Sequence, residues 1–216
     1  MLLMTNRKLV VVFGTGGHVK VVLSTVEAEN KYKVAGLLDD DESKYGKRVH
    51  GYKVLGGREE LVRLRDQNIS RAVVAIGDNL KRAEVASCLE SNGFQIVNAV
   101  HPSATIIRGS RLGKGTVVLP HAHIGGDAVL GSGVIVSVGA VVGHDCEVGP
   151  WAHLCPGAKL AGNVRIGEST LIGTNASVLF GVIIGPKVVV GANAVAIDDL
   201  PGEVTAVGVP AQIIGN

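Results

Sequence analysis

The chain has 216 residues, a net charge of +2 and only 3% aromatic residues, a length that suffices for two modest domains. Its basic residues are scattered among acidic ones, which argues against a nucleic-acid-binding stripe or a membrane-binding patch. No run approaches the roughly 18 apolar residues of a membrane span, and the short apolar run Met1–Leu3 does not predict a signal peptide. Three cysteines without a CxxC pair favour reduced thiols and a cytoplasmic protein.

The first hundred residues alternate between apolar runs and helix-like segments. Strands are expected over 8–13, 34–38, 72–76 and 94–98, and helices over 18–29, 57–67 and 79–92. This alternation predicts a small, Rossmann-like parallel sheet with helices on its faces. Ligands bind such sheets at the carboxyl ends of the strands, where Gly14, Asp39 and Gly77 fall.

A glycine-rich turn, Gly14 to Gly17, joins the first strand to the first helix. Such a turn points backbone N–H groups and the positive end of a helix dipole at an anion. The dinucleotide fingerprint requires a third glycine where this chain has Val19. A tight turn, an NAD site and a site for another phosphate-bearing ligand are therefore all possible interpretations, and the last is favoured.

From Val100 to Ala194 the sequence repeats with a period of six residues. An aliphatic residue recurs at every sixth position as far as Val190, and a small or β-branched residue follows each of them four positions later. This period fits neither a helix face nor a plain alternating strand, but it suits a chain that turns a corner every six residues and stacks coil upon coil. The predicted domains are 1–99, 100–195 and a tail, 196–216. In this tail the pairing of short strands between successive coils is expected to break at Ala196–Asp199.

Several motifs resemble one family along nearly the whole chain: FGTGGHVK, LLDD, AIGDN, HPSA, GHDC and GVPA. Together they resemble the hexapeptide-repeat nucleotide-sugar acetyltransferases of the PglD, NeuD and perosamine N-acetyltransferase type. The resemblance implies an N-terminal domain that holds a nucleotide sugar, then a left-handed parallel β-helix with about 18 residues per coil. It also implies acetyl-CoA as co-substrate, a C-terminal cap, and a homotrimer with active sites between subunits.

Counting one coil forward from His144 leads to Gly162, which has no side chain. The histidine then has open space beside it and a free N–H nearby, as acyl transfer requires of a general base and an oxyanion donor. The resemblance makes His144 the general base and Asp145 its modulator. Neighbours on a strand point in opposite directions, so Asp145 can orient the imidazole only if the pair occupies a corner.

The resemblance also suggests binding residues. Gly16, Gly17 and His18 would face the diphosphate or sugar, Asp39 and Asp40 the ribose or base, and Gly77 would lie nearby. The acetyl-CoA contacts would be His153, Gly162, Thr174 and Ala192. Ser137 stands where a PglD-like protein can have an asparagine near the acceptor.

The predicted function is acetyl-CoA-dependent N-acetylation of a UDP- or GDP-linked amino-deoxy sugar. The alternatives are a sugar O-acetyltransferase of the sialic-acid type, a zinc protein like the γ-carbonic anhydrases, and a non-catalytic nucleotide-sugar-binding module. His121, His123 and His153 do not stack within one chain, so an intrachain zinc site is disfavoured and no metal is expected. The base, the ring position of the acceptor and the pathway stay open.

Overall fold

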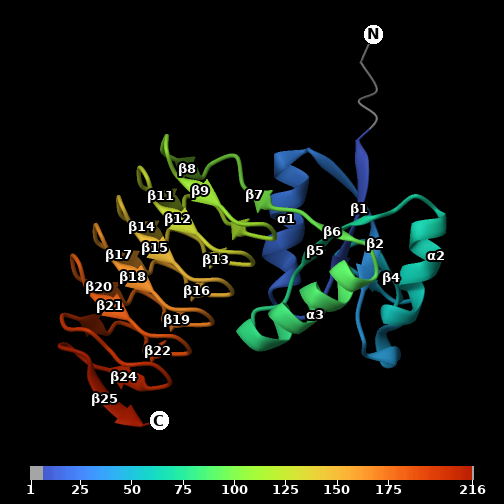
Figure 1. Ribbon diagram of the computed structural model, residues 1–216. Coiled ribbons are helices and arrows are strands. Elements are labelled where there is room, and N and C mark those ends of the chain that lie inside the picture. The colour runs from blue at the N-terminus through green and yellow to red at the C-terminus, as the bar shows by residue number, and fades with distance from the viewer. Residues whose placement is uncertain (1–6, 216) are drawn as a thin grey trace.

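The computed structural model describes residues 7–215 as an α/β domain followed by a long coil of short strands (Figure 1). The run Met1–Leu3, which is too short to predict a signal peptide, lies outside these residues. Within residues 7–215, no helix is both long and apolar enough to cross a membrane.

The N-terminal domain is the small Rossmann-like sheet that the alternating pattern predicts. Its strands are ordered β3-β4-β2-β1-β5-β6, and all neighbours pair in parallel except β3 and β4. The strands are β1 (Lys8–Phe13), β2 (Tyr32–Leu38), β3 (Arg48–Val49), β4 (Tyr52–Gly56), β5 (Arg71–Val74) and β6 (Gln95–Ile96). The helices are α1 (Val19–Glu29), α2 (Leu61–Asp66) and α3 (Asn79–Ser91), with 3-10 turns η1 (Glu42–Lys44) and η2 (Arg58–Glu60).

Two local predictions need correction, and one element was missed. The helix expected over 57–67 starts as the 3-10 turn η2, and the strand expected over 94–98 pairs only at Gln95–Ile96 before the chain turns into the coil. The hairpin of β3 and β4 was not predicted at all. Its turn places His50 and Gly51 at positive φ angles of 49° and 83°, and its strands carry enough charge to hide the apolar pattern.

The coil consists of three parallel sheets, and each turn of the chain contributes one strand to each. Sheet I contains β7 (Ala99–Val100), β10 (Val117–Val118), β13 (Ile135–Val136), β16 (His153–Leu154), β19 (Leu171–Ile172), β22 (Val189–Val190), β24 (Thr205–Val207) and the antiparallel β25 (Gln212–Gly215). Sheet II contains β8 (Thr105–Ile106), β11 (His123–Ile124), β14 (Val141–Val142), β17 (Lys159–Leu160), β20 (Ser177–Val178) and β23 (Val195–Ala196). Sheet III contains β9 (Arg111–Leu112), β12 (Val129–Leu130), β15 (Glu147–Val148), β18 (Arg165–Ile166) and β21 (Ile183–Ile184).

The register gives the coil length directly. Ile135 pairs with His153, and 153 − 135 = 18, so equivalent residues of successive coils are 18 positions apart. From β10 to β23 the second residue of each two-residue strand points inward, as the complete burial of Ile124, Leu154 and Ile172 illustrates. The three sheets form a triangular prism, which is the left-handed parallel β-helix that the resemblance implies.

The N-terminal domain lies against sheet I, with α1 beside β7 (Figure 1). Val117 and Ile135 of sheet I belong to the same buried cluster as Val10 and Leu37 of the N-terminal sheet. The boundary expected between residues 99 and 100 falls inside β7.

Pairing continues beyond residues 196–199, where the ladder was expected to break. Leu200 bridges to Ile184 of sheet III, β24 pairs in parallel with β22, and β25 then pairs with β24. The spacing changes in this tail, but the strand edge of the last regular coil is still covered.

Two neighbouring isoleucines in β21 test whether successive side chains of a strand point alternately out of and into the coil. Ile184 is 1% exposed and Ile183 is 44% exposed. We expect Ile184→Ala to lower the free energy of unfolding by about 2–5 kcal/mol, because it leaves a cavity in a narrow interior. The matched control, Ile183→Ala, should change it by about 0.5 kcal/mol. Urea denaturation measures both values, and equal losses would contradict the assigned orientation.

Candidate active site

The glycine-rich turn after β1 forms one wall of a pocket of about 300 Å³. A Cβ on Gly14 would lie 2.8 Å from the Ala75 carbonyl oxygen, and this residue has a φ of 110°, so only glycine fits there. Gly16 and Gly17 instead face open space within 4 Å. The pocket brings together all six residues predicted to bind substrate: Gly16, Gly17, His18, Asp39, Asp40 and Gly77.

Asp39 ties the glycine-rich turn to the end of β2. Its carboxylate accepts hydrogen bonds from the Thr15 N–H at 2.9 Å and from the Thr15 hydroxyl, and Lys44 Nζ lies 3.3 Å away. Burial raises the pKa of Asp39, but the hydrogen bonds from Thr15, the Asp41 N–H and Lys44 outweigh burial, so the pKa is lowered. Asp40 forms an ion pair with Arg58.

His144 lies at the corner between sheets II and III, after β14 and before β15. Asp145 has a φ of 58°, the left-handed conformation that turns its side chain back toward its neighbour. The two side chains therefore meet, with 2.7 Å between His144 Nδ1 and Asp145 Oδ2. Because a carboxylate can only accept, Nδ1 carries a hydrogen, and in the neutral ring Nε2 is then the acceptor.

Gly162 lies directly beside that free nitrogen, one coil further along. A Cβ on Gly162 would be 2.5 Å from His144 Nε2, so any side chain here would displace the imidazole. Within residues 7–215 the Gly162 N–H has no hydrogen-bond acceptor. The predicted pairing of an imidazole with an empty space and an unused donor is therefore present in the geometry.

Phe180 completes this corner and was missed by the sequence analysis. Its ring centroid is 6.4 Å from that of His144, although 36 residues separate them in sequence. Counting two coils forward from His144 instead of one would have found it. Phe180 is 66% exposed and follows Gly162 by one coil, on the C-terminal side of the space beside it.

His153 lies elsewhere, on sheet I beneath the N-terminal domain. Its ring centroid is 6.1 Å from that of His18, and its Nε2 is 3.2 Å from Ser137 Oγ. Burial lowers the pKa of both histidines to about 4, and the Arg82 charge adds to this effect. His18 Nε2 and His153 Nδ1 are buried without a hydrogen-bond partner in the described chain.

Thr174 and Ala192 stack in adjacent coils at the corner between sheets I and II. The Asn193 N–H donates to the Thr174 carbonyl at 2.8 Å, and the Ala192 nitrogen would lie 2.7 Å from a Cβ on Gly173. They are thus near the edge of the sheet that carries His153. Within one chain, the structure separates this set from His144 and Gly162.

Other candidate chemistry is weaker. Burial raises the pKa values of Cys146 and Cys155, and the Cys146 thiol donates to the Ala161 carbonyl, so neither has the character of an activated nucleophile. No group of three or more His, Cys, Asp and Glu side chains in the described part of the chain could hold a metal ion.

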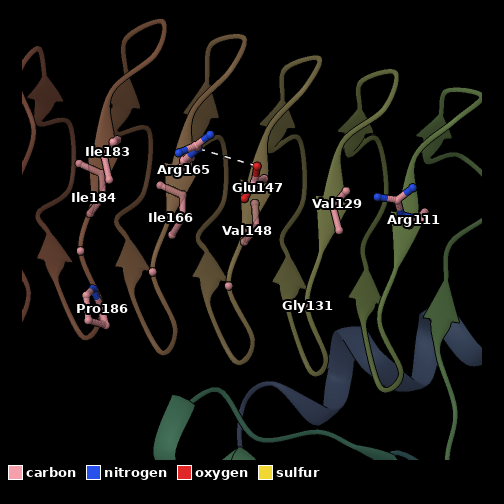
Figure 2. A pocket seen from close by; sticks show the side chains of 13 residues that line it. Arg111, Val129, Gly131, Glu147, Val148, Arg165, Ile166, Ile183, Ile184 and Pro186 are labelled. Atoms are coloured by element: carbon pink, nitrogen blue, oxygen red, sulfur yellow. Dashed lines mark ion pairs between the residues drawn. The ribbon is translucent and has the colours of Figure 1, made fainter.

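A larger groove, of about 590 Å³, follows the outer face of sheet III (Figure 2). Arg111, Glu147 and Arg165 line it, with 3.8 Å between Arg165 Nε and Glu147 Oε1. None of the predicted catalytic or binding residues lines this groove. Although it is larger than the pocket beside Gly16, it is therefore not the candidate active site.

Known proteins resemble this chain over each domain and over its whole length. Residues 9–89 match the family model of the PglD N-terminal domain. Over 122 residues the chain is 34% identical to a UDP-N-acetylbacillosamine N-acetyltransferase of Bacillus subtilis (strain 168); this alignment covers 52% of the chain and about half, 51%, of that relative.

Two solved structures match almost end to end. A mutant of perosamine N-acetyltransferase from Caulobacter crescentus, in complex with CoA and GDP-perosamine, is 42% identical with a TM-score of 0.92, covering 96% of this chain and 97% of that chain. The acetyltransferase domain of PglB from Neisseria gonorrhoeae FA1090, in complex with acetyl coenzyme A, is 34% identical with a TM-score of 0.89, covering 97% and 100%.

The buried histidine pair predicts a pH dependence of stability. His18 and His153 should titrate near pH 4 rather than 6.5 in an imidazole NMR titration. The unfolded chain then binds more protons than the folded chain between about pH 4 and 6.5, so the free energy of unfolding should fall as the pH drops through that window. His18→Asn and His153→Asn should each flatten this slope. Titration midpoints near pH 6.5 would contradict the burial of the two rings.

Proposed function

The chain belongs to the hexapeptide-repeat nucleotide-sugar N-acetyltransferases, and we propose that it transfers the acetyl group of acetyl-CoA to the amino group of a nucleotide-activated amino-deoxy sugar. The observation that carries this proposal is the corner at His144. There, one imidazole nitrogen is held by Asp145 while the other faces a space kept open by Gly162.

The reaction needs only groups that this corner supplies. The neutral amine attacks the thioester carbonyl, His144 Nε2 accepts the proton that the amine loses, and Asp145 holds the ring through Nδ1. The Gly162 N–H stabilises the oxyanion of the tetrahedral intermediate. A C–N bond forms, the C–S bond breaks, and the proton passes to the departing CoA sulfur.

The acceptor is an amino rather than a hydroxyl group. Both the perosamine enzyme and the bacillosamine enzyme are named as N-acetyltransferases, which supports N-acetylation over the sialic-acid type of O-acetylation. Their names pair the sugar with GDP in one case and UDP in the other, so we propose either nucleotide for this chain. The pocket beside Gly16 and Gly17 would hold the diphosphate, with Asp39 and Asp40 toward the ribose or base.

The complete site requires more than one chain. The N-terminal domain covers sheet I, whereas His144 occupies the corner between sheets II and III, which lies opposite sheet I in a triangular prism. A sugar bound near His18 therefore cannot reach His144 of the same chain. We propose a homotrimer in which His144 and Gly162 of one subunit face the nucleotide pocket, His153, Thr174 and Ala192 of the next.

Exposed apolar side chains support that association. Five of the exposed apolar residues in the described part of the chain lie at the two corners that flank sheet II, outside the region covered by the N-terminal domain: Ile107, Val138, Leu179, Phe180 and Ile197. Burying such residues against a second copy would remove apolar surface from water. We place the reaction in the cytoplasm, which agrees with three free cysteines.

A thiol-release assay with acetyl-CoA and a panel of UDP- and GDP-amino sugars tests the function. We expect at least one amino sugar to release CoA, and the matching hydroxy sugar to release none. His144→Ala should reduce turnover by roughly 10²-fold or more without loss of fold. Near-normal turnover of this variant, or transfer to the hydroxy sugar alone, would refute the proposed reaction.

Two glycines that are each 18 residues from His144, and so lie in the same column of stacked residues, test the open space beside its imidazole. Gly162→Ala keeps the backbone N–H but places a Cβ 2.5 Å from His144 Nε2, so the imidazole must move away from its productive position. We expect kcat to fall by about 10²-fold. Gly126→Ala is the matched control, one coil before His144, where the nearest atom to the new Cβ is 3.4 Å away. Equal activity of the two variants would argue against a direct role for this space.

A further inference from the structure

Arg82 of α3 is a buried cation that the proposed chemistry does not use. Its side chain is 1% exposed, and within residues 7–215 it forms no ion pair with a carboxylate. Burial lowers its pKa to about 10, so the guanidinium remains charged at neutral pH. A buried charge is costly unless its donors are well satisfied, and here carbonyl oxygens from both domains satisfy them.

One set of acceptors lies in the nucleotide pocket. Arg82 Nη1 donates to the Ile76 and Gly77 carbonyls at 3.1 and 2.9 Å. Both residues follow β5 and line the pocket of about 300 Å³ that contains His18. The guanidinium thus fixes the loop at the carboxyl end of the central strands.

The other set lies in the turns of the coil. Arg82 Nε donates to the Gly133 carbonyl at 2.9 Å, and Nη2 donates to the Trp151 carbonyl at 2.7 Å. Trp151 and Ala152 immediately precede His153 on β16. The same side chain therefore sets the position of the pocket loop and of the strand that carries His153.

Asn79 reinforces the connection. Its side-chain oxygen accepts from Arg82 Nη2 at 2.9 Å, and its side-chain nitrogen donates to the Ser169 carbonyl of the coil at 2.8 Å. The planar guanidinium donates from three nitrogens held in a fixed geometry, whereas a lysine ammonium donates from one nitrogen on a flexible stem. This geometry suits a residue that fixes orientation between two rigid parts.

We propose that Arg82 is a positioning residue that holds the nucleotide-sugar pocket in register with the sheet I edge of the coil, so that a bound sugar is presented at one defined place. The inference rests on the proposed function. Besides the buried cluster that they share, the coil and the N-terminal domain each have a hydrophobic cluster of their own, so we expect loss of Arg82 to leave both ligands bound but misplaced relative to one another.

The test uses Arg82→Met and Arg82→Lys in the full chain. Arg65→Met is the control, because Arg65 is exposed and its side chain donates, within residues 7–215, only to the Asn92 carbonyl. Calorimetry measures the Kd values of the nucleoside diphosphate and of CoA, and the thiol-release assay measures kcat. We expect both Kd values to stay within about threefold while kcat falls by about 10²-fold in both Arg82 variants. Asn79→Ala should lower kcat by a smaller factor.

Two results would overturn the proposal. One is a kcat within threefold of wild type in a folded Arg82 variant; the other is a nucleotide Kd that rises in step with the loss of kcat, which would indicate collapse of the pocket. If Arg82→Met does not fold, Arg82→Lys and Asn79→Ala decide the question. A wild-type chain without transfer to any amino sugar would instead refute the proposed function.

Discussion

Parallel stacking at an interval of 18 residues is the constraint on which the rest of this structure depends. It places each side chain beside its equivalent in the next coil, so distance along the sequence converts directly into neighbourhood in space. His144, Gly162 and Phe180 meet at one corner because they are successive members of one column. Because Gly162 has no side chain, a space stays open between His144 and Phe180.

Periodicity and strand order made much of the molecule predictable from its sequence. The coil, its buried aliphatic positions and the approach of His144 to Gly162 all derive from one six-residue repeat. The six pocket residues converge because parallel strands end at one edge of the sheet. The meeting of His144 with Asp145 could not be predicted in this way. It depends on a left-handed φ at Asp145, a conformation that aspartate tolerates but does not dictate.

The position of Arg82 was invisible to sequence reasoning for a different reason. Five of its six acceptor oxygens are backbone carbonyls, from residues as unlike as Gly77, Gly133 and Trp151. Every residue type has such a carbonyl, so the partners of a buried guanidinium leave no mark in the sequence. The hairpin of β3 and β4 was missed for a related reason, since its charged residues conceal two short strands.

The triangular cross-section explains how the chain can divide one reaction between two surfaces. One face of the prism, sheet I, holds the N-terminal domain, and Arg82 connects the coil to the pocket that we propose for the nucleotide sugar. The corner opposite that face carries the imidazole, and the apolar side chains around sheet II lie between the two. In the homotrimer that we propose, the corner of one chain would meet the covered face of the next, so that each pair of neighbouring chains would form one site. In such an arrangement the orientation of the N-terminal domain on its own coil determines where the sugar meets the neighbouring base, so the contact within one chain sets the geometry between two.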